Sequence, residues 1–191
     1  RSRNEMARPY RKAVLKALLI VTLIGAGLAN RARLSDMYER ERQRARRDNS
    51  PMTMLVLDLD HFKAVNDEHG HEIGDRALQH VTRIFRDCLR ATDLPTRLGG
   101  EEFAILLTNT NGRQGLEVAE KIRMAISTDP LVINDATIRL TLSGGVAELG
   151  VDGDSLHELV RKADERLYGA KDFGRNQIVP VPTSNPLADP T

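Results

Sequence analysis

Hydrophobic residues recur along this chain with two different spacings, and the change of spacing divides it into strands and helices. Continuous apolar runs bounded by turn residues or carboxylates predict buried strands, with shorter extended pieces between them, at 52–58, 96–98, 103–108, 136–147 and 177–179. Apolar residues spaced by three and four positions predict helices at 61–68, 73–89, 114–127 and 155–171. Strands and helices therefore alternate along most of the chain.

A highly charged segment at 31–47 precedes the first strand. It carries Leu34, Met37 and Tyr38 among many charged residues, which predicts a helix that is mostly solvated. The charge run is typical of a solvent-facing surface. An alternative is a helical interaction module that uses this segment for dimerisation.

The order of these elements predicts an α+β fold. A strand, two helices, a hairpin, a helix, a strand, a helix and a final strand are close to the split β-α-β arrangement, a ferredoxin-like core with additions. We expect an antiparallel-rich central sheet flanked by helices. The first strand and the hairpin should be neighbours in it, which brings Asp58 and Asp60 opposite Glu101 and Glu102 in the hairpin turn.

Both ends of the chain differ in composition from the middle. Residues 17–29 are thirteen uncharged residues after a basic stretch. This run is short for a bilayer-spanning helix and resembles a signal peptide, and we favour a third interpretation, a helix packed at the edge of the domain. Because residue 1 is Arg, we expect 1–26 to be the end of an upstream region, sensory or membrane-bound. Residues 179–191 are rich in proline and small polar residues and predict a disordered tail.

Composition excludes several classes of protein. Hydrophobic residues make up 40% and charged residues 29% of the 191 residues, which argues against disorder over most of the length. The formal net charge of +1 gives no general electrostatic attraction for nucleic acid. Cys88 is the only cysteine, so the chain forms no internal disulfide and no cysteine-based zinc cluster, as expected of a cytoplasmic protein.

The expected group of carboxylates suggests a cation site. Like charges held a few ångström apart repel, so they share a proton or bind a cation, and ligands that are oxygen atoms alone favour Mg²⁺ or Mn²⁺. Gly99 and Gly100 in the same turn let a phosphate approach the backbone closely. The simpler alternative is a tight hairpin with acidic turn residues.

Taken together, these motifs resemble those of the GGDEF domains, the diguanylate cyclases. The turn lies in RLGGEEFAILL (97–107), a variant with Glu in place of the usual Asp. Further matching blocks follow the family's order from 27 to 178: LDLDHFKAVND (57–67), GHEIGDRAL (70–78), AEKIR (119–123), TLSGGVA (141–147) and ADERLYGAKDFGRNQI (163–178).

This resemblance implies a nucleotidyltransferase that condenses two GTP molecules into cyclic di-GMP and two pyrophosphates. Each domain would bind one GTP, so the active form would be a homodimer. Each new bond would form when a 3′-hydroxyl attacks an α-phosphate, a step that needs cations, fixed phosphates and an aligned nucleophile. The rival interpretation is a non-catalytic cyclic di-GMP receptor that keeps the GGDEF fold.

The resemblance also assigns residues to the reaction. It implies that Asp58, Glu101 and the backbone carbonyl of Leu59 bind Mg²⁺ or Mn²⁺, and that Glu102 assists with the metal or with deprotonation of the attacking hydroxyl. Asn66 and Asp75 match the pair that recognises guanine. The remaining GTP-binding residues that it implies contact phosphates, and they are His61, Phe62, Lys63, Gly99, Gly100, Lys171 and Arg175.

A regulatory site is implied as well. Arg90 and Asp93 form an RxxD sequence six positions before Gly99, where the family's product-inhibition site is found. Arginine can donate two parallel hydrogen bonds to a guanine edge. Lys121 stands where many members have a second arginine, so we expect weaker inhibition here.

Two departures from the family pattern concern the fold rather than the chemistry. The usual Asp-x-Leu-Thr before residue 27 is replaced by Leu23, Ile24, Gly25 and Ala26, which puts the geometry of the domain's entry in question. Gly144 replaces a usual apolar residue, and we expect it to loosen its strand or to mark a bulge.

Overall fold

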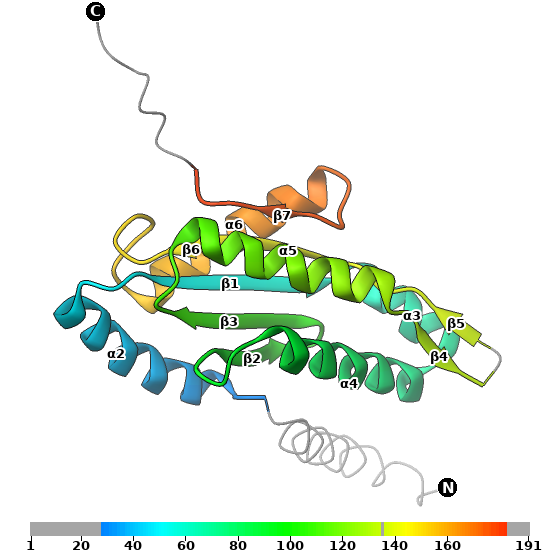
Figure 1. Cartoon of the computed structure of the whole chain (residues 1–191). Coiled ribbons are helices and arrows are strands. Elements are labelled where there is room, and N and C mark those ends of the chain that lie inside the picture. Colours follow the sequence, from blue (N-terminus) through cyan, green and yellow to red (C-terminus); the bar gives the residue numbers. More distant parts are fainter. Residues whose placement is uncertain (1–27, 135, 183–191) are drawn as a thin grey trace, which may run out of the picture.

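A computed structural model describes residues 28–134 and 136–182 of the chain (Figure 1). The described helices are α2 (Arg31–Asp48), α3 (Phe62–His69), α4 (His71–Cys88), α5 (Gly112–Thr128) and α6 (Leu156–Asp172). The strands are β1 (Met52–Leu59), β2 (Leu94–Gly99), β3 (Glu102–Thr108), β4 (Leu131–Ile133), β5 (Ala136–Ile138), β6 (Leu142–Glu148) and β7 (Ile178–Val179). Helices and strands alternate as the apolar spacing predicts.

The central sheet has five strands in the order β2-β3-β1-β6-β7. β1 pairs antiparallel with β3 on one side and with β6 on the other, and only β7 is parallel to its neighbour. The hairpin β2-β3 is therefore next to the first strand, as expected. This arrangement confirms the α+β fold with an antiparallel-rich sheet.

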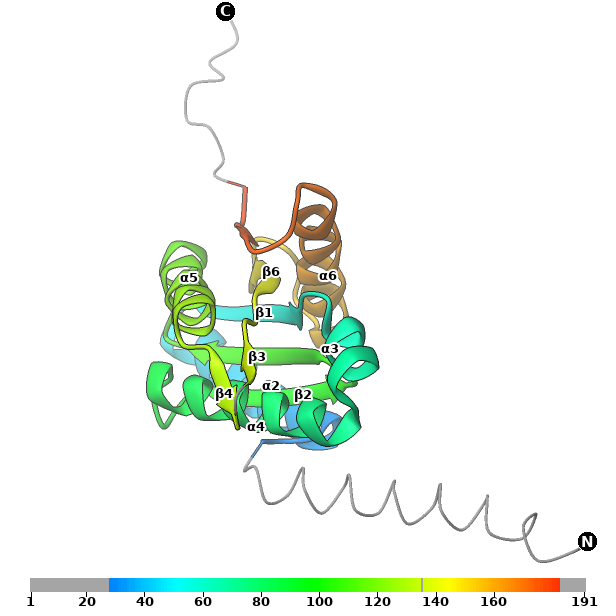
Figure 2. The same cartoon turned by 90° about the vertical axis from the view of Figure 1, so that its right-hand side faces the viewer.

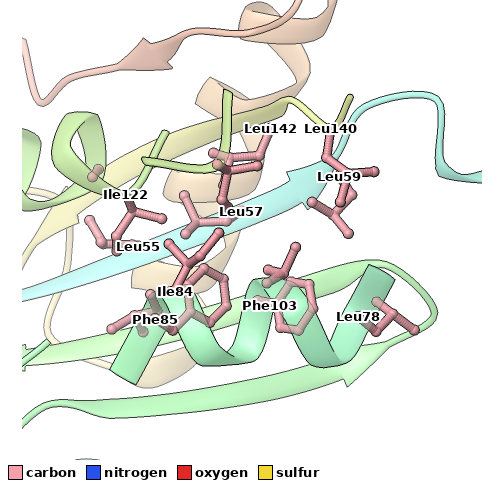
Figure 3. Close-up of a cluster of buried hydrophobic side chains, with 14 of the residues drawn as sticks. Leu55, Leu57, Leu59, Leu78, Ile84, Phe85, Phe103, Ile122, Leu140 and Leu142 are labelled. Atoms are coloured by element: carbon pink, nitrogen blue, oxygen red, sulfur yellow. The ribbon is translucent and has the colours of Figure 1, made fainter. Parts of the chain in front are cut away.

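The sheet is covered by helices on both faces, since the residues of β1 alternate between two cores. Leu55, Leu57 and Leu59 pack with α4 and α5 (Figure 3). Met54 and Val56 point the other way and pack with α2 and α6. Figure 2 shows α5 and α6 on opposite sides of the strands. All eight residues of β1 are buried, so the central strand is a rigid base for whatever stands at its end.

The expected single strand at 136–147 is wrong. It consists of two strands, β5 and β6, and β5 pairs antiparallel with β4 in a separate two-stranded sheet. Sequence pattern missed β4 entirely. Because Ile138, Leu140 and Leu142 are all buried in the same core, the apolar run continues through the break, and spacing alone does not reveal it.

The expectation for Gly144 is also corrected. Its pairing with Leu57 lies in an uninterrupted register between β1 and β6, without a bulge. A Cβ atom at this position would lie 2.4 Å from Leu57 Cδ2 and 2.9 Å from Ile178 Cδ1. The glycine makes room for these two core side chains, so its role is close packing.

The two terminal segments are described only in part. Residues 17–27 of the apolar run and 183–191 of the proposed tail lie outside the described residues. Ala29 is buried and bridges to Thr96 of β2. At the other end Val179 belongs to β7 and Val181 packs against the core. Within the described ranges, no helix has the length and apolar character needed to cross a bilayer.

Candidate functional site

Acidic side chains from two strands meet at one end of the central sheet. Asp58 stands near the end of β1, directly opposite Glu102 of β3 in the antiparallel register. Directly opposed residues project from the same face of a sheet. The backbone N–H of Leu59 donates to the carbonyl of Glu101 at 3.3 Å, which extends the pairing to the hairpin turn. The structure thus brings Asp58, Glu101 and Glu102 to one corner, as the sequence predicts.

A lysine side chain also reaches this corner. Asp58 projects from the face that α6 covers, and Lys171 in the last turn of α6 places its Nζ 2.9 Å from Asp58 Oδ1. The Lys171 side chain is 32% exposed and the Asp58 side chain 9%. A lysine side chain that is about a third exposed has room to turn toward an incoming anion.

The environment raises the pKa of Asp58. Burial contributes most, because a low-dielectric surrounding disfavours the charged form, and the nearby Glu101 and Glu102 act in the same direction. The hydrogen bond and charge of Lys171 oppose these effects without cancelling them. Because Lys171 does not fully compensate the charge of this carboxylate, Asp58 is suited to bind a divalent cation.

Arg97 is hydrogen-bonded to the glycine turn. Gly100 has a left-handed backbone with φ of 51°, which glycine adopts without strain. Arg97 Nε donates to the carbonyl of Gly100 at 2.8 Å, and the pairing of β2 with β3 shifts register between Arg97 and Gly99. Burial lowers the pKa of Arg97, while the neighbouring Asp75 and Glu101 raise it. Hydrophobic spacing assigns Arg97 no part in the site, and only its position two residues before Gly99 could have indicated one.

Asp60 does not join the other carboxylates, which corrects the expectation for it. Its side chain accepts hydrogen bonds from Ser143 Oγ at 2.7 Å and from Thr141 Oγ1 at 2.8 Å. It also accepts from the backbone N–H of Asn176 at 3.0 Å. Asp60 is buried and accepts three hydrogen bonds within the fold, so it acts as a structural acceptor and is turned away from the other carboxylates by its partners.

The N-terminus of α3 follows β1 directly. His61 is the N-cap residue with φ of 56° and offers no side-chain hydrogen bond to the first turn. Its carbonyl accepts from the N–H groups of Ala64 and Val65. Phe62 is buried in the core, whereas Lys63 is exposed. The uncapped first turn at 61–63 can offer backbone N–H groups and a positive dipole end to an anion.

Asn66 and Asp75 lie on the two helices that follow. Asn66 Nδ2 donates to the carbonyl of Phe62 at 3.3 Å. Gly74 lies next to it, and a Cβ there would come within 2.0 Å of Asn66 Oδ1. Asp75 is exposed and lies near enough to Arg97 to affect its pKa. Gly74 therefore lets α4 bring Asp75 toward both Asn66 and the glycine turn.

The loop after α6 carries Arg175. Its backbone is left-handed, with φ of 65°, and its N–H donates to the carbonyl of Ala170 at 3.0 Å. The helix ends at Asp172, so Lys171 and Arg175 flank the end of α6. The end of α6 therefore places two basic residues, Lys171 and Arg175, on the side of the molecule where Asp58 lies.

The donor set at this corner fits a hard divalent cation that shares its ligands with a substrate. Among residues 28–134 and 136–182, no three His, Cys, Asp or Glu side chains form a cluster that could hold a metal ion by themselves. Mg²⁺ is usually held by one or two carboxylates together with substrate phosphates, and only oxygen donors are required. Asp58, Glu101 and the carbonyl of Leu59 match that partial set.

A cleft of about 500 Å³ lies at the C-terminal end of α4, away from the acidic corner. Arg90, Asp93 and Lys121 all line it, so the structure brings the three residues of the implied regulatory site together. Asp93 accepts from the backbone N–H of Arg90 at 2.9 Å, and burial raises its pKa. The RxxD sequence is therefore a turn beyond the helix. Lys121 Nζ donates to the carbonyl of Cys88 at 3.3 Å.

Comparison with known proteins places these features in one family. The family model described as "Diguanylate cyclase, GGDEF domain" matches residues 26–177. The response regulator PleD of Caulobacter vibrioides is 37% identical over 163 residues, which is 84% of this chain and 36% of that protein. The bifunctional diguanylate cyclase/cyclic di-GMP phosphodiesterase MucR of Pseudomonas aeruginosa is 42% identical over 149 residues, or 78% of this chain and 22% of MucR. The chain thus spans about a third or less of these relatives.

Solved structures agree with the sequence comparison. The active GGEEF domain of a diguanylate cyclase from Vibrio cholerae has a TM-score of 0.76 and 31% identity, over 82% of this chain and 99% of that domain. The GGDEF domain of DgcB from Caulobacter crescentus, in complex with c-di-GMP, has a TM-score of 0.74 and 31% identity. The match covers 80% of this chain and 88% of the chain in that structure.

Proposed function

Because the chain belongs to the GGDEF domain family of diguanylate cyclases, we propose that it joins two GTP molecules into cyclic di-GMP and releases two pyrophosphates. One observation carries this proposal: Asp58, Glu101 and Glu102 meet at one end of the sheet, with Lys171 in contact with Asp58. Carboxylates for a divalent cation and a lysine for phosphates are what phosphoryl transfer to a hydroxyl requires.

In this proposal Asp58 and Glu101, with the Leu59 carbonyl, hold Mg²⁺ or Mn²⁺. When bound, such an ion neutralises the charge that develops on the phosphate oxygens. Lys171 would leave Asp58 and contact the phosphates, because the divalent cation replaces it as the counter-charge of that carboxylate.

The triphosphate would lie between two backbone segments and two basic side chains. We assign the first turn of α3, at His61, Phe62 and Lys63, and the Gly99-Gly100 turn to backbone contacts with phosphate oxygens. Lys171 and Arg175 would supply the positive charge. Fixing the phosphates in this way aligns the α-phosphate for attack and lowers the entropic cost of the step.

The remaining residues are assigned to recognition of guanine and to deprotonation of the attacking hydroxyl. Asn66 and Asp75 would bind guanine, because a carboxylate accepts from the base N–H groups while an amide both donates and accepts. Glu102, which is exposed, would assist with the metal or accept the proton of the attacking 3′-hydroxyl. The proton would leave as the hydroxyl attacks the α-phosphate and pyrophosphate departs.

The reaction requires two copies of the domain. One site of this kind holds one GTP, and the attacking hydroxyl belongs to a second GTP, so two domains must face each other. We therefore propose a homodimer as the active form, with GTP as substrate in the cytoplasm.

We also propose that the cleft of Arg90, Asp93 and Lys121 binds the product and inhibits the enzyme. Arg90 can donate two parallel hydrogen bonds to a guanine edge, whereas the Lys121 ammonium acts as a point charge. The DgcB domain was solved in complex with c-di-GMP, which supports a product site in this family.

A turnover assay tests the proposal. The protein is incubated with GTP and Mg²⁺, and pyrophosphate and cyclic di-GMP are measured over a range of protein concentrations. We expect both products, with a specific activity that rises with concentration. Glu101→Ala should reduce turnover by on the order of a thousandfold, because it removes a ligand of the catalytic cation. Glu39→Ala changes an exposed glutamate on α2 that pairs with Arg42 and serves as the matched control.

The receptor interpretation gives a different result in the same assay. A non-catalytic receptor would bind cyclic di-GMP and make no pyrophosphate at any protein concentration. Activity that survives Glu101→Ala would instead contradict the assignment of Glu101 as a metal ligand, while the proposal of diguanylate cyclase activity would stand.

A further inference from the structure

The loop between α6 and β7 has an unfavourable backbone. Gly174, Arg175 and Asn176 have φ of 106°, 65° and 46°, so three consecutive residues lie in the left-handed region. Glycine accepts this conformation and asparagine tolerates it, but arginine rarely adopts it. A strained segment of this kind persists only where surrounding contacts hold it, and such contacts often serve a site.

Asp60 supplies one of these contacts from the end of β1. It accepts from the backbone N–H of Asn176 at 3.0 Å, while Thr141 and Ser143 donate to it from the start of β6. The Asp60 residue is only 5% exposed. The orientation of its carboxylate is therefore determined by three donors, and it in turn determines where the backbone of Asn176 lies.

Arg123 of α5 supplies the second contact. Its Nη1 donates to Asn176 Oδ1 at 2.9 Å. Glu120, one turn earlier on the same helix, accepts from Arg123 Nε at 2.7 Å and orients the guanidinium. Asn176 is thus held through its backbone by Asp60 and through its side chain by Arg123. We call Asp60, Arg123 and Asn176 the Asn176 clamp.

The two ends of the loop are attached to the same strand end. Lys171 contacts Asp58, and Asn176 contacts Asp60, two residues further along the chain. Figure 1 shows the turn between α6 and β7 on the side of the molecule to which the arrowhead of β1 points. Arg175 lies between these attachments and next to Asn176, so the position of its backbone depends on the clamp.

We propose that Asp60 and Arg123 are positioning residues for the reaction, which hold Asn176 so that Arg175 faces the phosphates of GTP. This inference rests on the proposed function, since it assumes that Arg175 contacts phosphate. It gives the second aspartate of the sequence Asp58-Leu59-Asp60 a task separate from that of the first. Neither Asp60 nor Arg123 would touch the substrate.

The test measures binding of a nucleotide that cannot react. 3′-Deoxy-GTP lacks the attacking hydroxyl, so calorimetric titration in Mg²⁺ reports affinity alone. Asp60→Asn should weaken binding about tenfold, the usual size of coupling within a hydrogen-bonded network. In an Arg175→Ala background the same change should have no further effect if Asp60 acts on the phosphate through Arg175, as proposed. A merely structural role for Asp60 predicts additive losses.

A second variant covers the case in which Asp60→Asn does not fold. Arg123→Ala alters a side chain near the surface of α5 and should weaken binding about threefold, again only when Arg175 is present. Asp152→Asn is the matched control. Asp152 is also a buried acceptor, bonded to Arg166 and to the N–H of Glu148 at the opposite end of β6, and its loss should destabilise the fold without changing nucleotide affinity.

The possible results separate the two proposals. If the unaltered protein does not bind 3′-deoxy-GTP, the proposed function fails. If it binds but Arg123→Ala and every folded Asp60 variant act additively with Arg175→Ala, or change nothing, the clamp is a structural contact and this inference is overturned.

Discussion

Asp58 shows how a functional residue conflicts with stability at the scale of one side chain. It is buried beside two glutamates, and Lys171 compensates only in part, so its pKa is raised in the folded protein. An acid with a raised folded pKa binds protons more readily in the folded state than in the unfolded one. Its charge therefore costs stability as the pH rises through the folded pKa, and costs nothing below the ordinary value of 3.8.

Asp58→Asn should accordingly raise the unfolding midpoint at pH 7, and the gain should shrink as the pH falls toward 3.8. The same variant should lose turnover by on the order of a thousandfold, because an amide is a poor ligand for a divalent cation. Thermal unfolding at several pH values, without nucleotide, measures the first effect. A variant that is less stable than the parent at pH 7 would show that the Lys171 pair outweighs burial.

At the scale of elements, the site depends on how closely α6 approaches the sheet. Lys171 reaches Asp58 only because α6 packs directly on β6. The contact is made at Gly145, where a Cβ would lie 2.0 Å from the carbonyl oxygen of Ala163 and 2.8 Å from the backbone N of Leu167. Backbone atoms of a helix cannot move aside individually, so a side chain here must displace the helix.

Gly145→Ala should destabilise the fold by about 2 kcal/mol, the cost of overpacking a well-filled core. It should also reduce turnover, because moving α6 moves Lys171 and Arg175 away from Asp58. Gly169→Ala on the same helix is the control. A Cβ at Gly169 meets nothing within 4 Å, so this change should stabilise the helix by about 0.5–1 kcal/mol.

Denaturant unfolding gives both free energies, and the turnover assay gives the activities. If Gly145→Ala proved as stable and as active as the parent, the close approach of α6 would not be what sets the distance from Lys171 to Asp58.

At the scale of the whole molecule, the two proposed sites share one sheet. β3 begins at the acidic corner and ends beside the cleft of Arg90, Asp93 and Lys121, which Leu107 also lines. Product bound in that cleft would therefore lie at the other end of the strand from the reaction. Because none of the carboxylates of the acidic corner lines that cleft, inhibition by bound product would be a coupling between two distinct sites.

Arg90→Ala tests the proposed regulation. It should raise the cyclic di-GMP concentration needed for half inhibition by at least about tenfold, since it removes charge-assisted hydrogen bonds. Initial rates without product should stay unchanged, because Arg90 is remote from the acidic corner. Rates measured against added cyclic di-GMP decide the matter. An unchanged inhibition curve would mean that Arg90 has no part in product binding.

The sequence by itself determined the order of most elements, the α+β class and the residues of the acidic corner. Asp58, Glu101 and Glu102 could be found because they sit at predictable places, the end of a buried strand and the turn of a hairpin. Such positions follow from local periodicity and turn chemistry, which a sequence records directly.

Tertiary structure alone decided which partner each side chain takes. Asp58 and Asp60 look equivalent in the sequence, yet one pairs with Lys171 and the other with Ser143, Thr141 and Asn176. These partners are 81 to 116 positions away from Asp60. The division of 136–147 into β5 and β6 was hidden in the same way, because both parts are apolar and their separation depends on pairing with β4. The hydrophobic periodicity of a segment indicates which of its faces is buried, but long-range contacts determine which element packs against that face.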